Sequence, residues 1–230
     1  MFSYYGSKSK IVDCYPPPKY GKIIEPFAGS ARYSLKYWDR DITIVDKYDV
    51  ITDVWNYLKN ANKSDILSLP KLKKGDDIRT LNLAKEEILL IGFCINNGSV
   101  TPKNIVTEWG EKGWNTTRIK IANNVFKVNN WTIKNCSYDE LKNENSTWFI
   151  DPPYQNGGEH YKESATNIDF VKLGDWCKSR NGQVIVCENT KADWLPFKPV
   201  IEFAGAYTTT VEAIWSNHET AFDYVQQSLF

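Results

Sequence analysis

The sequence lacks an excess of charge of either sign. Its 28 lysines and arginines balance its 28 aspartates and glutamates, so the formal net charge is zero. The protein therefore has no overall positive field that would attract nucleic acid, and any surface that binds nucleic acid has to be a local patch of positive charge. No apolar run approaches the roughly 18 residues of a membrane-spanning helix, and the N-terminus has no signal-peptide pattern. We therefore expect a cytoplasmic protein without a membrane partner.

Cysteine and histidine are also scarce. The 5 cysteines lie far apart and never form a C-x-x-C pair, and there are only 2 histidines. This pattern argues against a structural zinc site, and the odd number of cysteines argues against a secreted disulfide framework. We expect reduced thiols and no metal. The residues concerned are Cys14, Cys94, Cys136, Cys177, Cys187, His160 and His218.

Short apolar runs alternate with helical patterns at both ends of the chain. Strands are predicted at about 22–26, 42–46, 147–151 and 183–188, with weaker candidates near 131–136, 200–204 and 211–215. Helices are predicted at about 30–39, 50–59, 81–94, 116–126 and 168–179. This alternation predicts an α/β fold with a mostly parallel sheet covered on both faces. The stretch from 60 to 127 breaks the pattern, and 230 residues leave room for one core and a small additional region.

One apolar run, residues 147–150, ends in Asp151, Pro152, Pro153 and Tyr154. The two prolines stiffen the backbone and donate no N–H groups, so nearby carbonyls stay free as acceptors. An exocyclic amino group can donate one hydrogen to the Asp151 carboxylate and the other to such a carbonyl. The Tyr154 ring can stack on the attached base. The motif therefore indicates a site for a planar nitrogenous substrate.

A simpler interpretation of the same four residues is a rigid loop after a buried strand. Asp151 would then be a cap and Tyr154 a packing residue. Pro-Pro-Tyr also occurs in ligand segments for small recognition domains. The functional interpretation therefore needs support from elsewhere in the chain.

Support comes from residues 22–31, where an apolar strand enters a tight turn of small residues and then a helix. Such a turn lets a ligand approach the backbone and the helix N-terminus. About twenty residues further on, a second strand ends in Asp46, where an acidic side chain can hold ribose hydroxyls. Each piece alone fits an ordinary β-α-β unit. Their order and spacing before Asp151 favour a nucleotide-like ligand.

In this order the motifs resemble those of the Dam-type DNA adenine-N6 methyltransferases, the alpha group of these S-adenosylmethionine-dependent enzymes. Residues 5–10 resemble the family's N-terminal Gly-Lys segment, and residues 25–30 its Pro-Phe-x-Gly turn. Asp46 stands where the family has an acidic ribose ligand, and residues 151–154 match its Asp-Pro-Pro-Tyr loop. Residues 212–217 resemble its late Glu-x-x-Trp-Ser-Asn segment. The resemblance covers both ends of the chain, and the middle only loosely.

The resemblance implies a Rossmann-like class I methyltransferase sheet, mixed and mostly parallel, with a small inserted target-recognition region. Residues 1–59 and 128–230 would form the catalytic domain, and residues 60–127 the insertion. The implied function is methyl transfer from S-adenosylmethionine to N6 of an adenine flipped out of double-stranded DNA, without a metal. A bacterial or phage-encoded enzyme is expected, as a monomer or alternatively a dimer. Restriction-modification, phage protection and regulation all stay open as its role.

The resemblance also assigns residues to the reaction. The catalytic residues would be Asp151, Pro152, Pro153 and Tyr154. The residues binding S-adenosylmethionine, or its product S-adenosylhomocysteine, would be Tyr5, Gly6, Lys8, Pro26, Phe27, Ala28, Gly29, Ser30, Asp46, Ser137, Tyr138 and Asp151.

Two positions depart from the family. A second glycine is common where this chain has Ala31, and an acidic residue commonly contacts the cofactor's adenine where this chain has Ser137. If Ser137 holds that position, the adenine amino group loses an anionic acceptor. Asp139 replaces it only if the local turn is shifted.

The stretch from 60 to 127 combines lysines, glycines and tryptophans. Interleaved in this way, such residues suit contact with phosphates and bases. The alternative is that the lysines are merely solvated and the tryptophans anchor the core or loops. Because the resemblance places target recognition here, we predict DNA contacts at Lys74, Trp109, Trp114, Arg118 and Lys120.

Other functions use a similar site. N4-cytosine DNA methyltransferases tend to carry Ser at the first motif position, and enzymes acting on RNA bases or protein glutamine typically carry Asn, so Asp151 favours adenine. A catalytically impaired, DNA-binding relative would be favoured only if Ala31 and Ser137 prevented cofactor binding.

Overall fold

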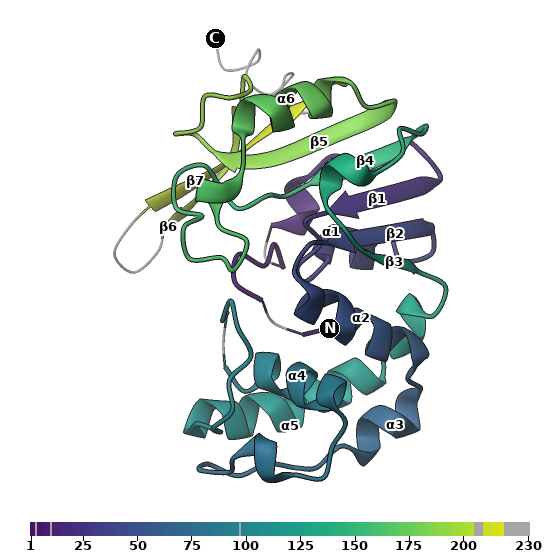
Figure 1. The fold of residues 1–230 in the computed structure, drawn as a ribbon, viewed down its shortest axis with the longest axis vertical. Coiled ribbons are helices and arrows are strands. Elements are labelled where there is room, and N and C mark those ends of the chain that lie inside the picture. The colour runs from purple at the N-terminus through teal and green to yellow at the C-terminus, as the bar shows by residue number, and fades with distance from the viewer. Residues whose placement is uncertain (3, 10, 97, 205–208, 219–230) are drawn as a thin grey trace.

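The computed structural model describes the chain except residues 3, 10, 97, 205–208 and 219–230 (Figure 1). A sheet of 7 strands dominates the described part of the molecule. The strands are β1 (Lys22–Pro26), β2 (Asp41–Asp46), β3 (Thr132–Asn135), β4 (Ser146–Ile150), β5 (Gly182–Asn189), β6 (Lys198–Ala204) and β7 (Thr209–Ser216). Every predicted strand is present, including the three weaker candidates.

The strands lie in the order β3-β2-β1-β4-β5-β7-β6. β1 to β5 pair in parallel, whereas β7 runs antiparallel to both β5 and β6. This is a Rossmann-like, mixed and mostly parallel sheet, so the predicted fold class is confirmed. The carboxyl ends of β1, β2, β4 and β5 meet at one edge of the sheet, where α/β folds place their ligands.

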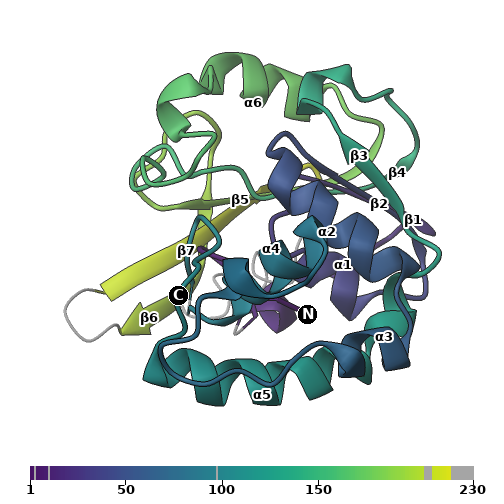
Figure 2. The same cartoon turned by 60° about the horizontal axis from the view of Figure 1, so that its bottom comes forward.

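The helices form two groups (Figures 1 and 2). Helices α1 (Arg32–Lys36), α2 (Asp49–Asn60) and α6 (Phe170–Lys178) cover its faces, whereas α3 (Lys63–Ser68), α4 (Lys85–Cys94) and α5 (Glu108–Ala122) gather beyond it. Short 3-10 helices are η1 (Val12–Cys14), η2 (Ile78–Thr80), η3 (Val125–Val128), η4 (Tyr138–Glu140) and η5 (Ala165–Asn167). Within the described ranges, no helix combines the length and apolarity needed to cross a membrane.

Side chains of the sheet alternate between two hydrophobic clusters, as the two-residue period of a strand requires. In β4, Trp148 and Ile150 belong to the cluster under α6, and Phe149 to the cluster on the opposite face. There Phe149 stacks on Tyr33 of α1, with ring centroids 4.2 Å apart. Both faces of the strand that precedes Asp151 are therefore buried and fixed.

The cluster around Phe149 continues beyond the sheet into α4 and α5. The ring of Phe2 links the two parts, since it lies 5.2 Å from Trp55 of α2 and 5.5 Å from Phe93 of α4. The N-terminal segment thus runs between the sheet and the helical group, as Figure 1 shows. This position brings the residues that follow Phe2 to the carboxyl edge of the sheet.

Helix boundaries differ from the prediction in the middle of the chain. α3 was not predicted, and its start is marked by a capping box between Asn62 and Asp65. α5 begins at Glu108 instead of about 116, because the Thr107 hydroxyl caps it by accepting the Gly110 N–H. A Cβ at Gly110 would lie 2.5 Å from the Ile95 carbonyl oxygen, so glycine is needed for this close packing. The glycines of α5 hid the helix from the sequence pattern.

The remaining helices lie where expected. α1, α4 and α6 are shorter than predicted, whereas α2 extends one residue further at each end. α1 begins at Arg32 instead of 30, because Ala31 has a left-handed backbone with a φ of 45°. α4 begins at Lys85 instead of 81, where the Glu87 carboxylate accepts the Ala84 N–H and marks the helix start.

Two residues predicted to contact DNA are buried in the helical group, so this prediction is wrong for both. Trp114 is 0% exposed, and its indole N–H donates to the Pro70 carbonyl. Arg118 is 7% exposed, and its guanidinium donates to the carbonyls of Leu67 and Leu69. Both side chains hold the segment after α3 against α5.

Replacing Arg118 by alanine should therefore weaken folding. Arg118→Ala leaves two inward-facing carbonyls without a charged donor, and we expect the free energy of unfolding to fall by about 2–4 kcal/mol. Urea unfolding followed by circular dichroism measures this. Lys120→Ala, at an exposed position of the same helix, should change stability by less than about 0.5 kcal/mol. Equal stability of the two variants would contradict the structural role of Arg118.

Candidate active site

A cavity of about 230 Å³ lies at the carboxyl edge of the sheet. Its walls come from the turn after β1, the end of β2, the turn into η4 and the loop after β4. The sequence-predicted site residues that line it are Phe27, Gly29, Asp46, Ser137, Tyr138, Asp151 and Pro153. The structure thus brings together motifs that are far apart in the sequence.

A smaller cavity of about 30 Å³ adjoins it and shares Phe27, Gly29 and Asp151. Its further predicted site residues are Tyr5, Gly6, Lys8, Ala28 and Ser30. Pro26 and Pro152 are buried beside the cavities as the flanks of these two loops.

The turn after β1 holds its backbone in an unusual conformation. Gly29 has a φ of 45°, and a Cβ there would lie 2.9 Å from Cδ1 of Tyr4, so only glycine fits without a shift. Ala31 has the same φ of 45°. Glycine adopts this left-handed conformation at lower cost than alanine, which explains why the resembling family has glycine at this position. Ala31 therefore keeps the turn shape at the cost of local strain.

Asp46 ties the end of β2 to this turn. Its Oδ2 accepts the Gly29 N–H at 2.9 Å, and its Oδ1 accepts the Tyr48 N–H at 2.9 Å. Burial raises the pKa of Asp46 to about 6, although these two N–H groups act in the opposite direction. Each oxygen keeps a lone pair that a ribose hydroxyl can use. Asp46 thus suits the predicted role of a ribose ligand.

The turn into η4 supplies polar and aromatic groups to the opposite wall. Ser137 and Asp139 both line the cavity, and the Asp139 carboxylate accepts a hydrogen bond from Lys172 at 2.8 Å. The rings of Phe27 and Tyr138 lie 5.4 Å apart and form an apolar part of the wall. An anionic side chain is therefore available near Ser137. Together with Asp46, these groups fit an adenosine-type ligand.

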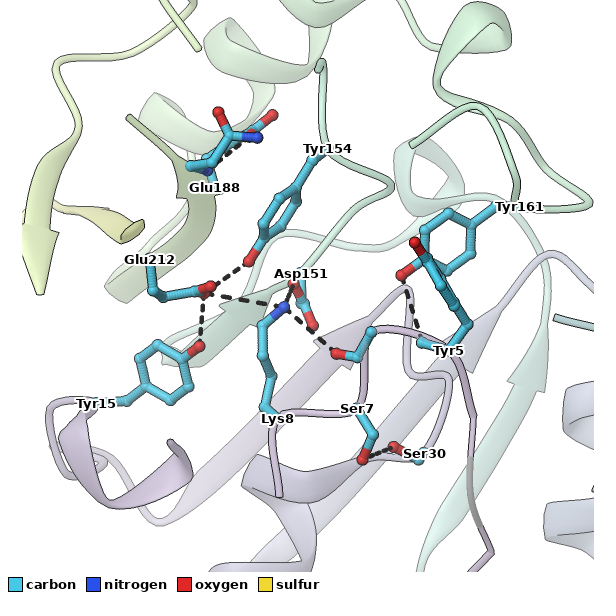
Figure 3. Close-up of polar contacts among 12 residues, drawn as sticks. Tyr5, Ser7, Lys8, Tyr15, Ser30, Asp151, Tyr154, Tyr161, Glu188 and Glu212 are labelled. Carbon is cyan, nitrogen blue, oxygen red and sulfur yellow. Dashed lines mark hydrogen bonds and ion pairs between the residues drawn. The ribbon is translucent and has the colours of Figure 1, made fainter. Parts of the chain in front are cut away.

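Asp151 follows β4 directly and is paired with a lysine from the N-terminal segment (Figure 3). Lys8 Nζ lies 2.9 Å from Asp151 Oδ1 and 3.8 Å from Glu212 Oε1. It also lies 4.5 Å from the centroid of the Tyr154 ring. The Asp151 carboxylate was predicted to accept a substrate amino group, and the Tyr154 ring to stack on a base. Lys8 occupies both positions.

The charges of this cluster depend on one another. Burial raises the pKa of Asp151 to about 6, with Lys8 acting to lower it and Glu212 to raise it. Burial alone would lower the pKa of Lys8, but the carboxylates of Asp151 and Glu212 outweigh burial and raise it above its usual value. Lys8 is therefore a cation at neutral pH.

Glu212 and Tyr15 are site residues that the sequence did not assign. Glu212 is 5% exposed, and its Oε1 accepts the Tyr154 hydroxyl at 2.6 Å and the Tyr15 hydroxyl at 2.7 Å. It lies in β7, paired with Asn189 at the end of β5. The segment 212–217 was noticed by resemblance, but nothing in the sequence indicated that its glutamate faces Tyr154.

A second buried glutamate holds the backbone after Tyr154. Glu188 Oε1 accepts the Gln155 N–H at 2.6 Å and the Trp194 indole N–H at 3.2 Å, and its Oε2 accepts the Asn189 N–H at 2.8 Å. The loop after β4 is therefore fixed to the end of β5. At the other end of β5, the Asn217 carboxamide accepts the Val184 N–H at 2.8 Å, which gives the late Asn a structural role.

The other predicted DNA contacts lie on the surface of the helical group. Trp109 is 86% exposed, and Lys120 is exposed on the same helix. Lys74 is exposed, with its Nζ 3.9 Å from Glu108 Oε2. The predicted contacts of these three residues with DNA stay predictions.

No family model and no curated protein matches the sequence. Solved structures are similar at low identity. A conserved hypothetical protein of Streptococcus pyogenes is 11% identical over 86% of this chain and 88% of that chain, with a TM-score of 0.33. A proposed methyltransferase of Escherichia coli is 10% identical over 90% and 78%, with a TM-score of 0.32. A proposed methylase of Haemophilus influenzae is 12% identical over 86% and 80%, with a TM-score of 0.36. These likenesses are too weak to decide a function.

Glu25, at the bottom of the smaller cavity, gives the site a measurable pH dependence. It is buried at the end of β1, and its Oε2 accepts both the backbone N–H and the hydroxyl of Ser34. Burial raises its pKa to about 8, although the Ser34 bonds act in the opposite direction. Between its usual pKa and about 8, the folded protein holds a proton that the unfolded chain has released. Stability should therefore fall as pH rises through this window.

Glu25→Gln should remove this part of the pH dependence. We expect the loss of unfolding free energy between pH 5 and 8 to be smaller in the variant than in the wild type, by roughly 3 kcal/mol. Urea unfolding at several pH values measures the difference. Asp46 and Asp151 titrate in both proteins, so the difference between the two curves reports Glu25 together with its coupling to Asp151. Parallel stability curves for the two proteins would show that Glu25 is not protonated in the folded state.

Proposed function

We propose that this protein transfers a methyl group from S-adenosylmethionine to N6 of an adenine flipped out of double-stranded DNA. The observation that carries the proposal is the position of the Asp151 carboxylate and the Tyr154 ring, which together hold a cation beside the cavity of Asp46 and Gly29. The proposal includes a monomeric enzyme in which residues 60–127 recognise the target.

The cavity residues would hold the cofactor by complementary chemistry. Asp46 would accept ribose hydroxyls, residues 27–29 would border the methionine moiety, and Ser137, Tyr138 and Asp139 would face the adenine. When bound, S-adenosylmethionine supplies a methyl group that its sulfonium has already activated. The chain's own task is then to position the acceptor and to complement its charge.

The target adenine has to leave the duplex, because its N6 edge is otherwise paired. Asp151 then accepts one N6 hydrogen, and a carbonyl of the Pro152-Pro153 unit accepts the other. Tyr154 stacks on the ring, with its hydroxyl fixed by Glu212 at 2.6 Å. Two acceptors in the plane of the amino group leave the nitrogen lone pair free to react. Asp151 and Pro153 also line the cofactor cavity, so the held nitrogen lies at its border.

Lys8 has to move before the base can bind. Its ammonium lies 2.9 Å from Asp151, where the amino group would bind, and over the Tyr154 ring, where the base would stack. Glu212 offers the departing cation a second carboxylate, since it already lies 3.8 Å from Nζ. The buried charge of Lys8 thus keeps a partner while the substrate takes its place.

The main alternative is an N4-cytosine DNA methyltransferase, because cytosine presents the same kind of amino group. Asp151 rather than Ser at the first motif position favours adenine. A catalytically impaired DNA-binding relative would lack a cofactor site. The intact turn around Ala31 and the presence of Asp139 beside Ser137 favour an active enzyme.

Two substitutions should separate chemistry from cofactor binding. Asp151→Ala removes the acceptor for the amino group, so methyl transfer to DNA should fall by about 10²–10³-fold or more. Its S-adenosylmethionine affinity, measured by calorimetry, should stay near that of the wild type. Asp46→Ala should show the converse, with cofactor binding weakened first. Near-normal methylation by Asp151→Ala would refute the assignment, and a wild type that binds no S-adenosylmethionine would favour the DNA-binding relative.

The rate of methyl transfer should depend on the ionisation of Asp151. The carboxylate accepts the N6 hydrogen only when it is ionised, and its pKa is about 6. The single-turnover rate at saturating cofactor and DNA should therefore rise with pH through about 6 and level off above it. Departure of Lys8 removes a group that lowers this pKa, and the amino group that replaces it donates a hydrogen bond that lowers it again, so we expect the midpoint to stay near 6. A rate that is constant from pH 5 to 8 would contradict this role.

A further inference from the structure

A second, much larger cavity of about 1070 Å³ lies between the helical group and α1. Figure 2 shows α5 along one edge of the molecule, with the N-terminal segment and α1 above it. From α5 the groove takes Trp109, Gly113, Thr117 and Lys120, which recur at helical spacing and so share one side of the helix. The opposite wall includes Arg32 of α1. We call this cavity the α1–α5 groove.

The α1–α5 groove carries positive charge. Arg32, Lys120 and Lys127 line it, and the described residues that line it include no aspartate or glutamate. In the part of the chain that the structure describes, none of these three cations forms an ion pair. The Arg32 guanidinium donates to the Ser7 hydroxyl and the Phe2 carbonyl, and Lys127 Nζ lies 5.9 Å from the Trp38 ring centroid. In a chain of zero net charge, this groove is a local positive surface.

Exposed aromatic rings lie at both ends of the groove. Trp109 lines one end and is 86% exposed. Beside Lys127, the exposed rings of Trp38 and Phe126 pack edge to face, with centroids 5.4 Å apart. Cations interleaved with open aromatic faces match a nucleic-acid strand, since lysines contact phosphates and bases stack on rings. A neutral protein surface would leave these three cations without counter-charges.

The groove is also connected to the catalytic cluster. Ser7 accepts a hydrogen bond from Arg32 Nε at 3.0 Å and from the Ser30 hydroxyl at 3.0 Å. The next residue, Lys8, reaches Asp151 at 2.9 Å. A strand lying in the groove would therefore contact the far side of the segment that occupies the catalytic carboxylate.

We propose that the α1–α5 groove binds the phosphodiester backbone of the DNA substrate, with Lys120 and Lys127 at phosphates and Trp109 against a base or sugar. This inference rests on the proposed function and assigns part of its DNA-binding surface. It adds Arg32 and Lys127 to the predicted contacts and retains Trp109 and Lys120. Trp114 and Arg118, which are buried, play no direct part.

Fluorescence anisotropy with a labelled DNA duplex of about 20 base pairs, without cofactor, tests the groove. Lys120→Gln/Lys127→Gln removes two phosphate contacts, so affinity near 0.1 M salt should fall by about 10–30-fold. The slope of log K against log salt should become shallower by about 2. The matched control is Lys112→Gln/Lys178→Gln, which removes two exposed lysines that lie 3.8 Å from Glu108 and Asp175 outside the groove. This control should stay within about twofold of the wild type.

Trp109→Ala provides an independent readout at a neutral residue. Affinity should fall by about fivefold or more, because a base or sugar loses its stacking face, while the salt slope stays unchanged. The lysine pair and Trp109 thus separate phosphate contact from stacking.

Wild-type affinity and salt slope in Lys120→Gln/Lys127→Gln would overturn the inference. Absence of duplex binding by the wild type at low salt would also overturn it. So would a lysine variant that changes only self-association in sedimentation, because this result would indicate that a second copy of the chain occupies the groove. If DNA binding depends on these lysines but no methylated base is formed, the result would contradict the proposed function and support DNA binding by the groove.

Discussion

Buried and half-buried carboxylates at the carboxyl edge of the sheet have to be supplied with hydrogen-bond donors or cations, and this constraint organises the site. Three of them receive main-chain donors. Asp46 accepts N–H groups from Gly29 and Tyr48, and Glu188 accepts those of Gln155 and Asn189. Glu25 accepts the N–H and the hydroxyl of Ser34. Because the main chain cannot leave, these three carboxylates fix the turn, the loop and the first strand in place.

The remaining two carboxylates are held by side chains, which can exchange. Asp151 is paired with the Lys8 ammonium, and Glu212 accepts hydroxyl groups from Tyr15 and Tyr154. In the proposed function, Asp151 stays paired with this nitrogen cation until the amino group of the substrate replaces it. A planar amino group of a base satisfies the same acceptor and the same aromatic face. In the proposed function, the carboxylates held by the main chain form the frame of the site, and the Asp151–Lys8 pair forms its reactive centre.

The sequence predicted the parts of this arrangement that follow from local pattern and from the geometry of parallel strands. Asp46 and Asp151 each end an apolar run, and parallel strands bring such ends to one edge. Glu212 was not assigned because β7 is antiparallel, so its glutamate reaches the site from the middle of its strand rather than from its end. Trp114 and Arg118 were misplaced because α5 contains two glycines and lacks a clear apolar stripe. The α1–α5 groove joins Arg32 to Lys120, and only tertiary packing brings them together.

The most direct test of the account is the chemical identity of the modified base. Mixed-sequence double-stranded DNA would be incubated with the protein and S-adenosylmethionine carrying a labelled methyl group, and the nucleosides separated by mass spectrometry. The arrangement of Asp151, Tyr154 and the exchangeable Lys8 predicts label in N6-methyladenine, at sites that sequencing can then map. Label only in N4-methylcytosine, or label in RNA and none in DNA, would contradict the assignment of adenine in DNA as the substrate.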